Sequence, residues 1–314
     1  MKYESVAVVV PVYQNRESLA DLLQQIFSVH AEHASDIDLS VIFVDDGSTD
    51  GSWGELTKLH SANPSRVSLI KLSRNFGQVN AILAGYAHAS SNAVITMSAD
   101  LQDPPELLAK MIDKWRSGSD VVIAHRAQRD DDLLSRIFSR AAYRVARRAH
   151  PDMPKGGFDC MLMSRKALDI LLSFPSRHRF LQGDILWLGL PTSFIPYARQ
   201  ARPHGRSTWS FSRKFKYFTD LLLDSSFVPI KAMSRLGFLI AFLGMLYAVI
   251  IVFARLANET PWPGWAPIMV TLLIVGGLIM VMLGVIGEYL WRIYDDIKGR
   301  PRYIVEEMWP TDRL

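Results

Sequence analysis

Short apolar runs alternate with amphipathic stretches in the N-terminal part of the chain. Runs with the uniform, β-branched composition of buried strands lie at residues 6–10, 39–44, 67–72, 93–97 and 120–124. The stretches that separate them, such as Ser18 to Phe27, carry leucine and isoleucine at helical spacing. Strands that alternate with helices in this way predict an α/β fold, a mostly parallel sheet with helices on both faces.

Two much longer apolar stretches follow, from Leu236 to Phe253 and from Ile268 to Ile286. With its flanks, each has roughly twenty residues, the length of a helix that crosses a bilayer. Basic residues precede the first stretch and follow the second, so the positive-inside rule predicts two transmembrane helices with both chain ends in the cytoplasm. A buried helical hairpin is the alternative, and the length and lack of charge disfavour it.

The segment just before the first long stretch mixes aromatic and basic residues. Its apolar residues have the spacing of one helical face, with basic residues among them: Phe211, Phe215, Phe218, Leu222 and Phe227, with Arg213, Lys214 and Lys216. This pattern predicts an amphipathic helix that lies on the membrane surface. A helix of the protein core is the alternative.

The amino-acid composition indicates which binding partners and which cellular compartment fit this protein. The formal net charge is +4 and there is no long run of Lys or Arg, so we expect no nucleic-acid partner; a membrane surface or a phosphorylated substrate fits the mild basic bias. Cys160 is the one cysteine, which excludes a disulfide within the chain and fits a reducing compartment. The N-terminal apolar run is short and interrupted by Pro11, which argues against a signal peptide.

Polar side chains follow the predicted strands at the points where the strands end. Tyr13, Asp45 and Asp100 all fall there, and ligands of parallel sheets bind beyond the carboxyl ends of the strands. Asp100 and Gln102 are two residues apart, so on an extended backbone they point to one face. Two hard oxygen donors suit Mg²⁺ or Mn²⁺ shared with substrate phosphates. The alternative is a solvated turn with Asp103 as a helix N-cap.

Arginines form clusters later in the same region. Arg126 and Arg129 follow the last predicted strand, Arg177 and Arg179 form a second group, and Arg202 belongs to a basic loop. Clustered guanidinium groups are planar and permanently charged, and they are typical of phosphate clamps.

The motifs of the N-terminal part resemble those of one enzyme family. The segments PVYQNRESL, VDDGSTDGS, LSRNFGQVNAILAGYAHA and SADLQDPPEL occur in the order and spacing of the inverting family 2 glycosyltransferases of GT-A fold. The later segments SRHRFLQGDILWLG, RPHGRSTWSFSRKFKY and GEYLWRIYDDIKGRPRY resemble the polyprenyl-phosphate branch of that family. That branch includes dolichyl-phosphate mannose synthase and the bacterial undecaprenyl-phosphate glucosyl- and aminoarabinosyl-transferases.

The resemblance implies an activity and an organisation. The activity is inverting transfer of a sugar from a nucleotide-diphosphate sugar, with uridine as the preferred base, to undecaprenyl phosphate at the cytoplasmic face of the inner membrane. A homo-oligomer is expected. The implied parts are a GT-A catalytic domain (1–209), a juxtamembrane amphipathic helix (210–234), a two-helix transmembrane hairpin (235–291) and a cytoplasmic tail (292–314).

The resemblance also assigns site residues. The implied nucleotide-binding residues are Pro11, Tyr13, Asn15, Glu17, Asp45, Asp46, Ser98 and Ala99. Asp100 and Gln102 would hold Mg²⁺ or Mn²⁺. The implied catalytic residues are Asp100, Asp159, Arg126 and Arg202, and the residues for the acceptor and its phosphate are Arg129, Arg177, Arg179, Ser207 and Lys214.

The chain departs from the family pattern at Ser98. The metal motif of the family is typically Asp-Ala-Asp-Leu-Gln, and here serine replaces the first aspartate. One ligand and one negative charge are lost, so we expect weaker metal binding, or a transfer of the role to Asp103 or water.

Two other functions remain open from the sequence. One is a family 2 transferase that uses another lipid-linked glycan as acceptor; processive synthases of that kind usually carry a QxxRW motif, and this sequence has none. The other is a weakly active, nucleotide-sugar-binding scaffold subunit, which the serine at position 98 suggests.

Overall fold

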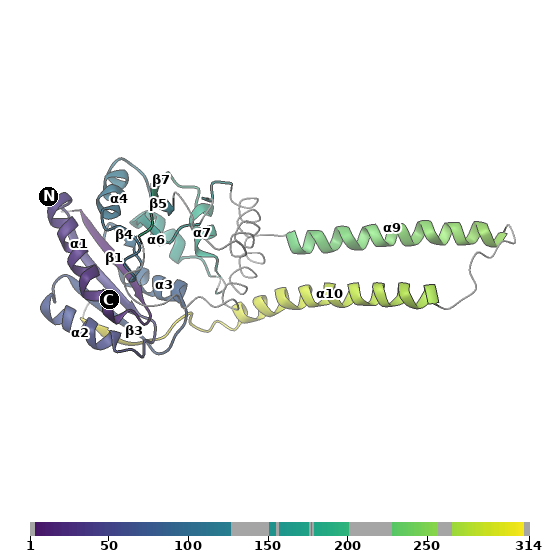
Figure 1. Ribbon diagram of the computed structural model, residues 1–314, viewed down its shortest axis with the longest axis horizontal. Helices are drawn as coiled ribbons and strands as arrows, with labels where there is room; N and C mark the ends of the chain where they lie inside the picture. The colour runs from purple at the N-terminus through teal and green to yellow at the C-terminus, as the bar shows by residue number, and fades with distance from the viewer. Residues whose placement is uncertain are drawn as a thin grey trace.

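The computed structural model describes residues 4–126, 151–154, 157–175, 177, 179–200, 228–256 and 266–310. These residues form an eight-stranded sheet covered by helices, and two long helices project from it side by side (Figure 1). The predicted α/β fold is therefore confirmed. The predictions for Arg129, Arg202, Ser207, Lys214 and the juxtamembrane helix fall almost wholly on residues outside the described ranges.

The sheet has the order β7-β5-β6-β4-β1-β2-β3-β8. The five predicted strands are all present, as β1 (Ser5–Val12), β2 (Asp38–Asp45), β3 (Val67–Leu72), β4 (Ala93–Thr96) and β5 (Val121–Arg126). Three further strands are β6 (Cys160–Ser164), β7 (Thr192–Tyr197) and β8 (Val305–Trp309). β6 and β8 run antiparallel to their neighbours and the other described pairs are parallel.

Helices bury both faces of the sheet. One face packs against α1 (Leu19–His33), α2 (Ser52–Ala62) and α4 (Leu107–Arg116). The other packs against α3 (Gln78–His88), α6 (Arg165–Leu172) and α7 (Leu181–Trp187). Val8 lies in the first core and Val9 in the second, so both alternating faces of β1 are buried. This explains why the strand is a continuous apolar run rather than an alternating one.

The last strand of the sheet comes from the C-terminal segment, which was expected to be a tail. β8 pairs with β3, and Lys71 forms an ion pair with Glu306 at 3.2 Å. The pairing extends beyond the strand, because the backbone N–H of Ser73 donates to the carbonyl of Ile304 at 3.0 Å. The chain therefore leaves the sheet after β7 and returns to it after the long helices.

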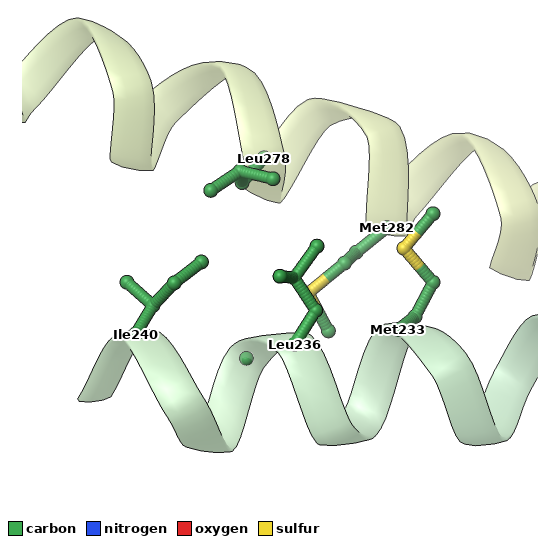
Figure 2. Close-up of a pocket in the computed structure, with 6 residues that line it drawn as sticks. Met233, Leu236, Ile240, Leu278 and Met282 are labelled. Carbon is green, nitrogen blue, oxygen red and sulfur yellow. The ribbon is translucent and has the colours of Figure 1, made fainter. Parts of the chain in front are cut away.

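The long helices are α9 (Val228–Leu256) and α10 (Ala266–Ile297), and both coincide with the predicted apolar stretches. Figure 2 shows side chains from the two helices pointing toward one another across a small apolar gap; the gap is lined by Met233, Leu236, Gly237, Ile240, Leu278 and Met282. Elsewhere their large apolar side chains are exposed; Phe238, for example, is 78% exposed. Exposed apolar surface on this scale marks a surface that contacts a partner or a membrane.

Among the described residues, one stretch is long and apolar enough to cross a membrane, judged by length and composition: Val270–Ile297 in α10. The apolar stretch found in α9, Met233–Tyr247, is shorter. The prediction of two transmembrane helices is thus supported for one helix and not confirmed for the other.

Candidate active site

The loops that follow β1, β2 and β4 meet at one edge of the sheet. The backbone N–H groups of Gln14 and Asn15 donate to the hydroxyls of Ser48 (3.0 Å) and Ser52 (3.2 Å). The Ser18 hydroxyl donates to the carbonyl of Ala99 at 2.6 Å. Three segments that are far apart in the sequence therefore form one hydrogen-bonded surface.

Most of the predicted nucleotide-binding residues lie on these loops. Pro11 is the last residue but one of β1 and is half-buried. Tyr13 and Asn15 follow the strand and are also half-buried, and Glu17 is exposed on the short 3-10 helix η1 (Arg16–Ser18). The Asn15 side chain accepts from the backbone N–H of Tyr13 at 3.3 Å, which folds the turn back on itself.

Asp45 ends β2 and is fully buried. Its Oδ1 accepts from the backbone N–H of Ser48 at 3.3 Å, whereas its Oδ2 has no hydrogen-bond partner in the described part of the chain. Burial raises the pKa of this carboxyl, against opposing hydrogen bonds from Ser48. A buried carboxylate oxygen without a partner is rare in native proteins and suggests a donor supplied by a ligand.

Asp46 has a different environment. Its two oxygens accept from the backbone N–H groups of Phe76 (2.7 Å) and Gly77 (2.9 Å), so it holds the loop after β3 against the loop after β2. Burial raises the pKa of Asp46 to about 6, although both hydrogen bonds act in the opposite direction. Gly47 lets the loops meet: it has φ +70°, and a Cβ there would lie 2.7 Å from backbone atoms of Arg74 and Asn75.

The loop after β4 carries the predicted metal ligands. Asp100 is 8% exposed, and the backbone N–H of Gln102 donates to its Oδ1 at 3.3 Å. Leu101 between them has φ +59°, a left-handed conformation that turns the chain sharply, so the extended backbone predicted for Asp100 and Gln102 is wrong. The segment after β7 lies alongside, because the backbone N–H of Gln200 donates to the carbonyl of Gln102 at 3.0 Å, and Arg199 lies 3.9 Å from Asp100.

Asp103 closes this loop. One oxygen accepts from both the backbone N–H (3.1 Å) and the hydroxyl of Ser98, and the other accepts from the hydroxyl of Tyr197 at 2.7 Å. Asp103 is not the N-cap of α4, which is Glu106. Since both its oxygens are engaged within the protein, Asp103 is poorly placed to replace the aspartate that is missing at position 98.

The loop has too few side-chain ligands to hold a metal ion by itself, but it offers oxygen donors to a metal ion that is also bound by the substrate. The described residues contain no group of three or more His, Cys, Asp or Glu side chains that could hold a metal ion. The carboxylate of Asp100 and the amide oxygen of Gln102 remain as oxygen donors. This set suits Mg²⁺ or Mn²⁺ that takes its other ligands from substrate phosphates and water.

An ion pair borders the same region. Arg126 ends β5 and donates to Asp159, just before β6, at 2.9 Å. Burial acts to lower the pKa of Arg126, but the nearby Asp159, Tyr197 and Asp103 outweigh it and the pKa is raised. The guanidinium therefore stays charged. Side-chain exposure is 16% for Arg126 and 45% for Asp159, so the carboxylate is the more accessible partner.

The two other described arginines of the predicted set contact different elements. Arg177 donates to Asp295 at 3.2 Å and its backbone N–H donates to Asp296, which fastens the end of α10. Arg179 has a side chain only 1% exposed and donates to Asp184 at 2.5 Å. Their predicted phosphate-binding role stays a prediction, and these contacts are alternatives to it.

Sequence reasoning missed Tyr197 and overlooked the contact made by Arg199. Tyr197 lies in a strand whose alternation is irregular, and its partner Asp103 is 94 residues away. The one signal in the sequence was a tyrosine at the start of an arginine-rich segment, a signal too weak to place it in a site.

Comparisons with known proteins agree with this geometry. The sequence profile of Glycosyl transferase family 2 matches residues 7–171. The chain is 32% identical over 309 residues to the undecaprenyl-phosphate 4-deoxy-4-formamido-L-arabinose transferase of Klebsiella pneumoniae, covering 97% of this chain and 94% of the relative. It is 30% identical over 304 residues to the SfII prophage-derived bactoprenol glucosyl transferase of Shigella flexneri, covering 96% and 97%.

A solved structure shares the fold. Glucosyl-3-phosphoglycerate synthase from Mycobacterium tuberculosis superposes with a TM-score of 0.51 at 15% sequence identity, over 71% of this chain and 80% of that protein. At this identity the likeness shows a common GT-A-like sheet and no more.

Proposed function

This chain belongs to glycosyl transferase family 2, as its motifs predicted, and we propose that it transfers a sugar from a nucleotide-diphosphate sugar to undecaprenyl phosphate with inversion. The observation that carries the proposal is the extent of the similarity. The two polyprenyl-phosphate transferases align with 96–97% of this chain, an extent that takes in α9 and α10 as well as most of the sheet. A UDP-sugar is our preferred donor.

The chemistry requires positioning and charge neutralisation more than a strong base. An acceptor phosphate has a second pKa of about 6 and is already largely ionised at pH 7. One of its oxygens forms a bond to the anomeric carbon on the face opposite the leaving group. The bond from that carbon to the diphosphate oxygen breaks, and the electron pair leaves with the nucleoside diphosphate.

The proposal gives several described residues a part in this reaction. The free oxygen of Asp45 would accept a hydrogen bond from the nucleoside, beside Tyr13 and Asn15. Asp100 and Gln102 would hold Mg²⁺ or Mn²⁺, which would neutralise charge on the diphosphate. Arg126, kept cationic by its neighbours, would bring two anions together at the edge of the sheet, with Asp159 holding its orientation.

We also propose that both long helices cross the membrane. β7 precedes α9 and β8 follows α10 in one sheet, so both ends of the hairpin lie on the same side of any membrane. The number of crossings must then be even, and if α10 crosses, α9 crosses too. α9 has 29 residues, about 44 Å at 1.5 Å per residue, and its apolar sequence continues to Phe253. That length exceeds the hydrocarbon core of about 30 Å.

The remaining organisation is also part of our proposal. The proposed catalytic domain comprises residues 1–209 together with β8 and lies in the cytoplasm at the inner membrane. The predicted amphipathic helix, which falls mainly on residues outside the described ranges, is proposed to keep it at the depth of the lipid phosphate. A homo-oligomer is part of the proposal. The support for the cytoplasmic side is the basic flanks of the hairpin.

A transfer assay tests the function. Purified protein is incubated with undecaprenyl phosphate and a panel of UDP- and GDP-sugars, with Mn²⁺ or with EDTA. We expect glycolipid from one donor, loss with EDTA, and a loss of roughly 100-fold or more in Asp100→Asn. Asp113→Asn, an exposed carboxylate on α4, is the matched control and should keep full activity.

Other outcomes separate the alternatives. Turnover that survives EDTA would keep the reaction and exclude the metal assignment. Donor binding without transfer to any polyprenyl phosphate would favour the scaffold subunit, and transfer only to a lipid-linked glycan would favour the other acceptor class.

A further inference from the structure

Tyr197 lies where two functional groups of the site meet. It ends β7 and is the register partner of Arg126 at the end of β5, and because the strands are parallel both side chains leave the same face of the sheet. Tyr197 is 7% exposed, and its hydroxyl donates to Asp103 at 2.7 Å. One side chain therefore borders both the Arg126–Asp159 ion pair and the loop after β4.

Asp103 also contacts the start of the loop after β4. It accepts two hydrogen bonds from Ser98, so residues 98 and 103 are joined and the loop between them is closed. Asp100 and Gln102 lie inside that closed segment. The Tyr197 hydroxyl therefore helps to set their position relative to Arg126, in addition to the backbone hydrogen bond from Gln200 to Gln102.

The environment of the Tyr197 hydroxyl keeps it protonated, so it remains a donor to Asp103. Burial raises the pKa of Tyr197, and the negative charge of Asp103 raises it further, so the hydroxyl stays protonated and donates. The residue at position 98 matters as well. An aspartate there would face the carboxylate of Asp103, whereas the serine donates to it.

We propose that Tyr197 is a positioning residue that fixes residues 98–103 relative to the Arg126–Asp159 pair. In this chain the Tyr197–Asp103–Ser98 connection orders a loop that has one carboxylate fewer than the family pattern. The inference rests on the proposed function, because the role of the loop is to bind Mg²⁺ or Mn²⁺ together with a diphosphate.

Tyr197→Phe tests the inference by removing one hydroxyl and keeping the ring. Binding of Mn²⁺ in the presence of UDP is measured by electron paramagnetic resonance, and binding of UDP in EDTA by calorimetry. Loss of an outer partner of a metal site typically weakens metal binding by about 10- to 100-fold. We expect a loss in that range for Mn²⁺, with UDP binding in EDTA changed less than about twofold.

Tyr86→Phe is the matched control. Tyr86 is fully buried and its hydroxyl is bonded to Thr96 in β4, so this variant also removes a buried tyrosine hydroxyl but leaves the loop contacts intact. It should bind Mn²⁺ as the wild type does. Ser98→Ala, which removes a different hydrogen bond to Asp103, should weaken Mn²⁺ binding and serves if Tyr197→Phe does not fold.

Two results overturn the inference alone: Mn²⁺ binding unchanged in both Tyr197→Phe and Ser98→Ala, or an equal loss in Tyr86→Phe. Wild-type protein that binds neither UDP nor Mn²⁺ would overturn the proposed function and this inference with it. The wild-type measurement therefore tells the two failures apart.

Discussion

Four aspartates at the ends of β2 and β4 have the same chemistry and four different environments. Asp45 has one oxygen without a described partner, Asp46 holds two backbone N–H groups, and Asp103 has both oxygens bonded to side chains or backbone. Asp100 lies between these extremes, with Gln102 and Arg199 nearby. The partners thus separate carboxylates that support the loops from those able to receive a ligand.

The raised pKa of Asp46 makes a prediction about stability. The pKa rises from 3.8 to about 6 because burial disfavours the charged form. The folded state then binds more protons than the unfolded state between these values, so the contribution of Asp46 is greatest below pH 3.8 and is lost as the pH rises through 6. The change is on the order of 2–3 kcal/mol.

Melting temperatures of wild type and Asp46→Asn, measured from pH 4 to pH 7.5, check this. The variant lacks the titration, so we expect the wild type to lose stability relative to it as the pH rises. Parallel curves would show that Asp46 has the same pKa in both states.

The positions of several individual site residues could be predicted from the sequence, but their long-range partners could not. Asp45 and Asp100 are placed at the sheet edge by the strands that precede them, which are local patterns. The partner of Asp103 depends on β7 lying beside β5, a long-range pairing that no local pattern encodes.

At the scale of elements, a strand could be predicted where its sequence has a strong apolar pattern. β1 to β5 are mostly apolar and largely buried, and they were predicted, whereas β7 has only two buried positions among six residues. β8 alternates weakly and follows a long apolar helix, so it was taken for part of a tail. An edge strand buries one face or less, which weakens the signal that identifies it.

The contact between the loops after β2 and β3 depends on one glycine. Gly47→Ala places a methyl group 2.7 Å from backbone atoms and forces a residue with φ +70° into a strained conformation. We expect a loss of about 1–3 kcal/mol in stability and at least tenfold weaker UDP binding, because Asp45 and Asp46 move with the loop. Calorimetry checks the binding. Gly54→Ala, where nothing lies within 4 Å of an added Cβ, is the control and should bind as the wild type.

At the scale of the molecule, three sets of described contacts connect α10 and the segment after it to the sheet domain. Arg177 binds Asp295 and Asp296 at the end of α10, and Arg302, which follows α10, donates to the carbonyl of Phe174. β8 then joins the segment after α10 to β3. The described contacts therefore hold the α10 end of the hairpin to the sheet domain.

Truncation after Arg302 removes β8 and tests its contribution. β3 then presents an unpaired edge, so we expect a melting temperature lower by several degrees and a tendency to aggregate in detergent. Truncation after Pro310 keeps the strand and should melt as the full chain does. Equal melting temperatures for the two truncations would show that β8 adds no stability.

The position of β8 also sets an order of assembly. β8 is synthesised after α10, so the sheet cannot be completed until nearly the whole chain has left the ribosome. While the hairpin is being made, the edge of β3 is open to pairing with other chains, the period when nascent proteins aggregate most readily. Synthesis of the hairpin therefore precedes completion of the sheet, and on the proposed membrane topology a chain that stalls at the membrane carries an unfinished sheet.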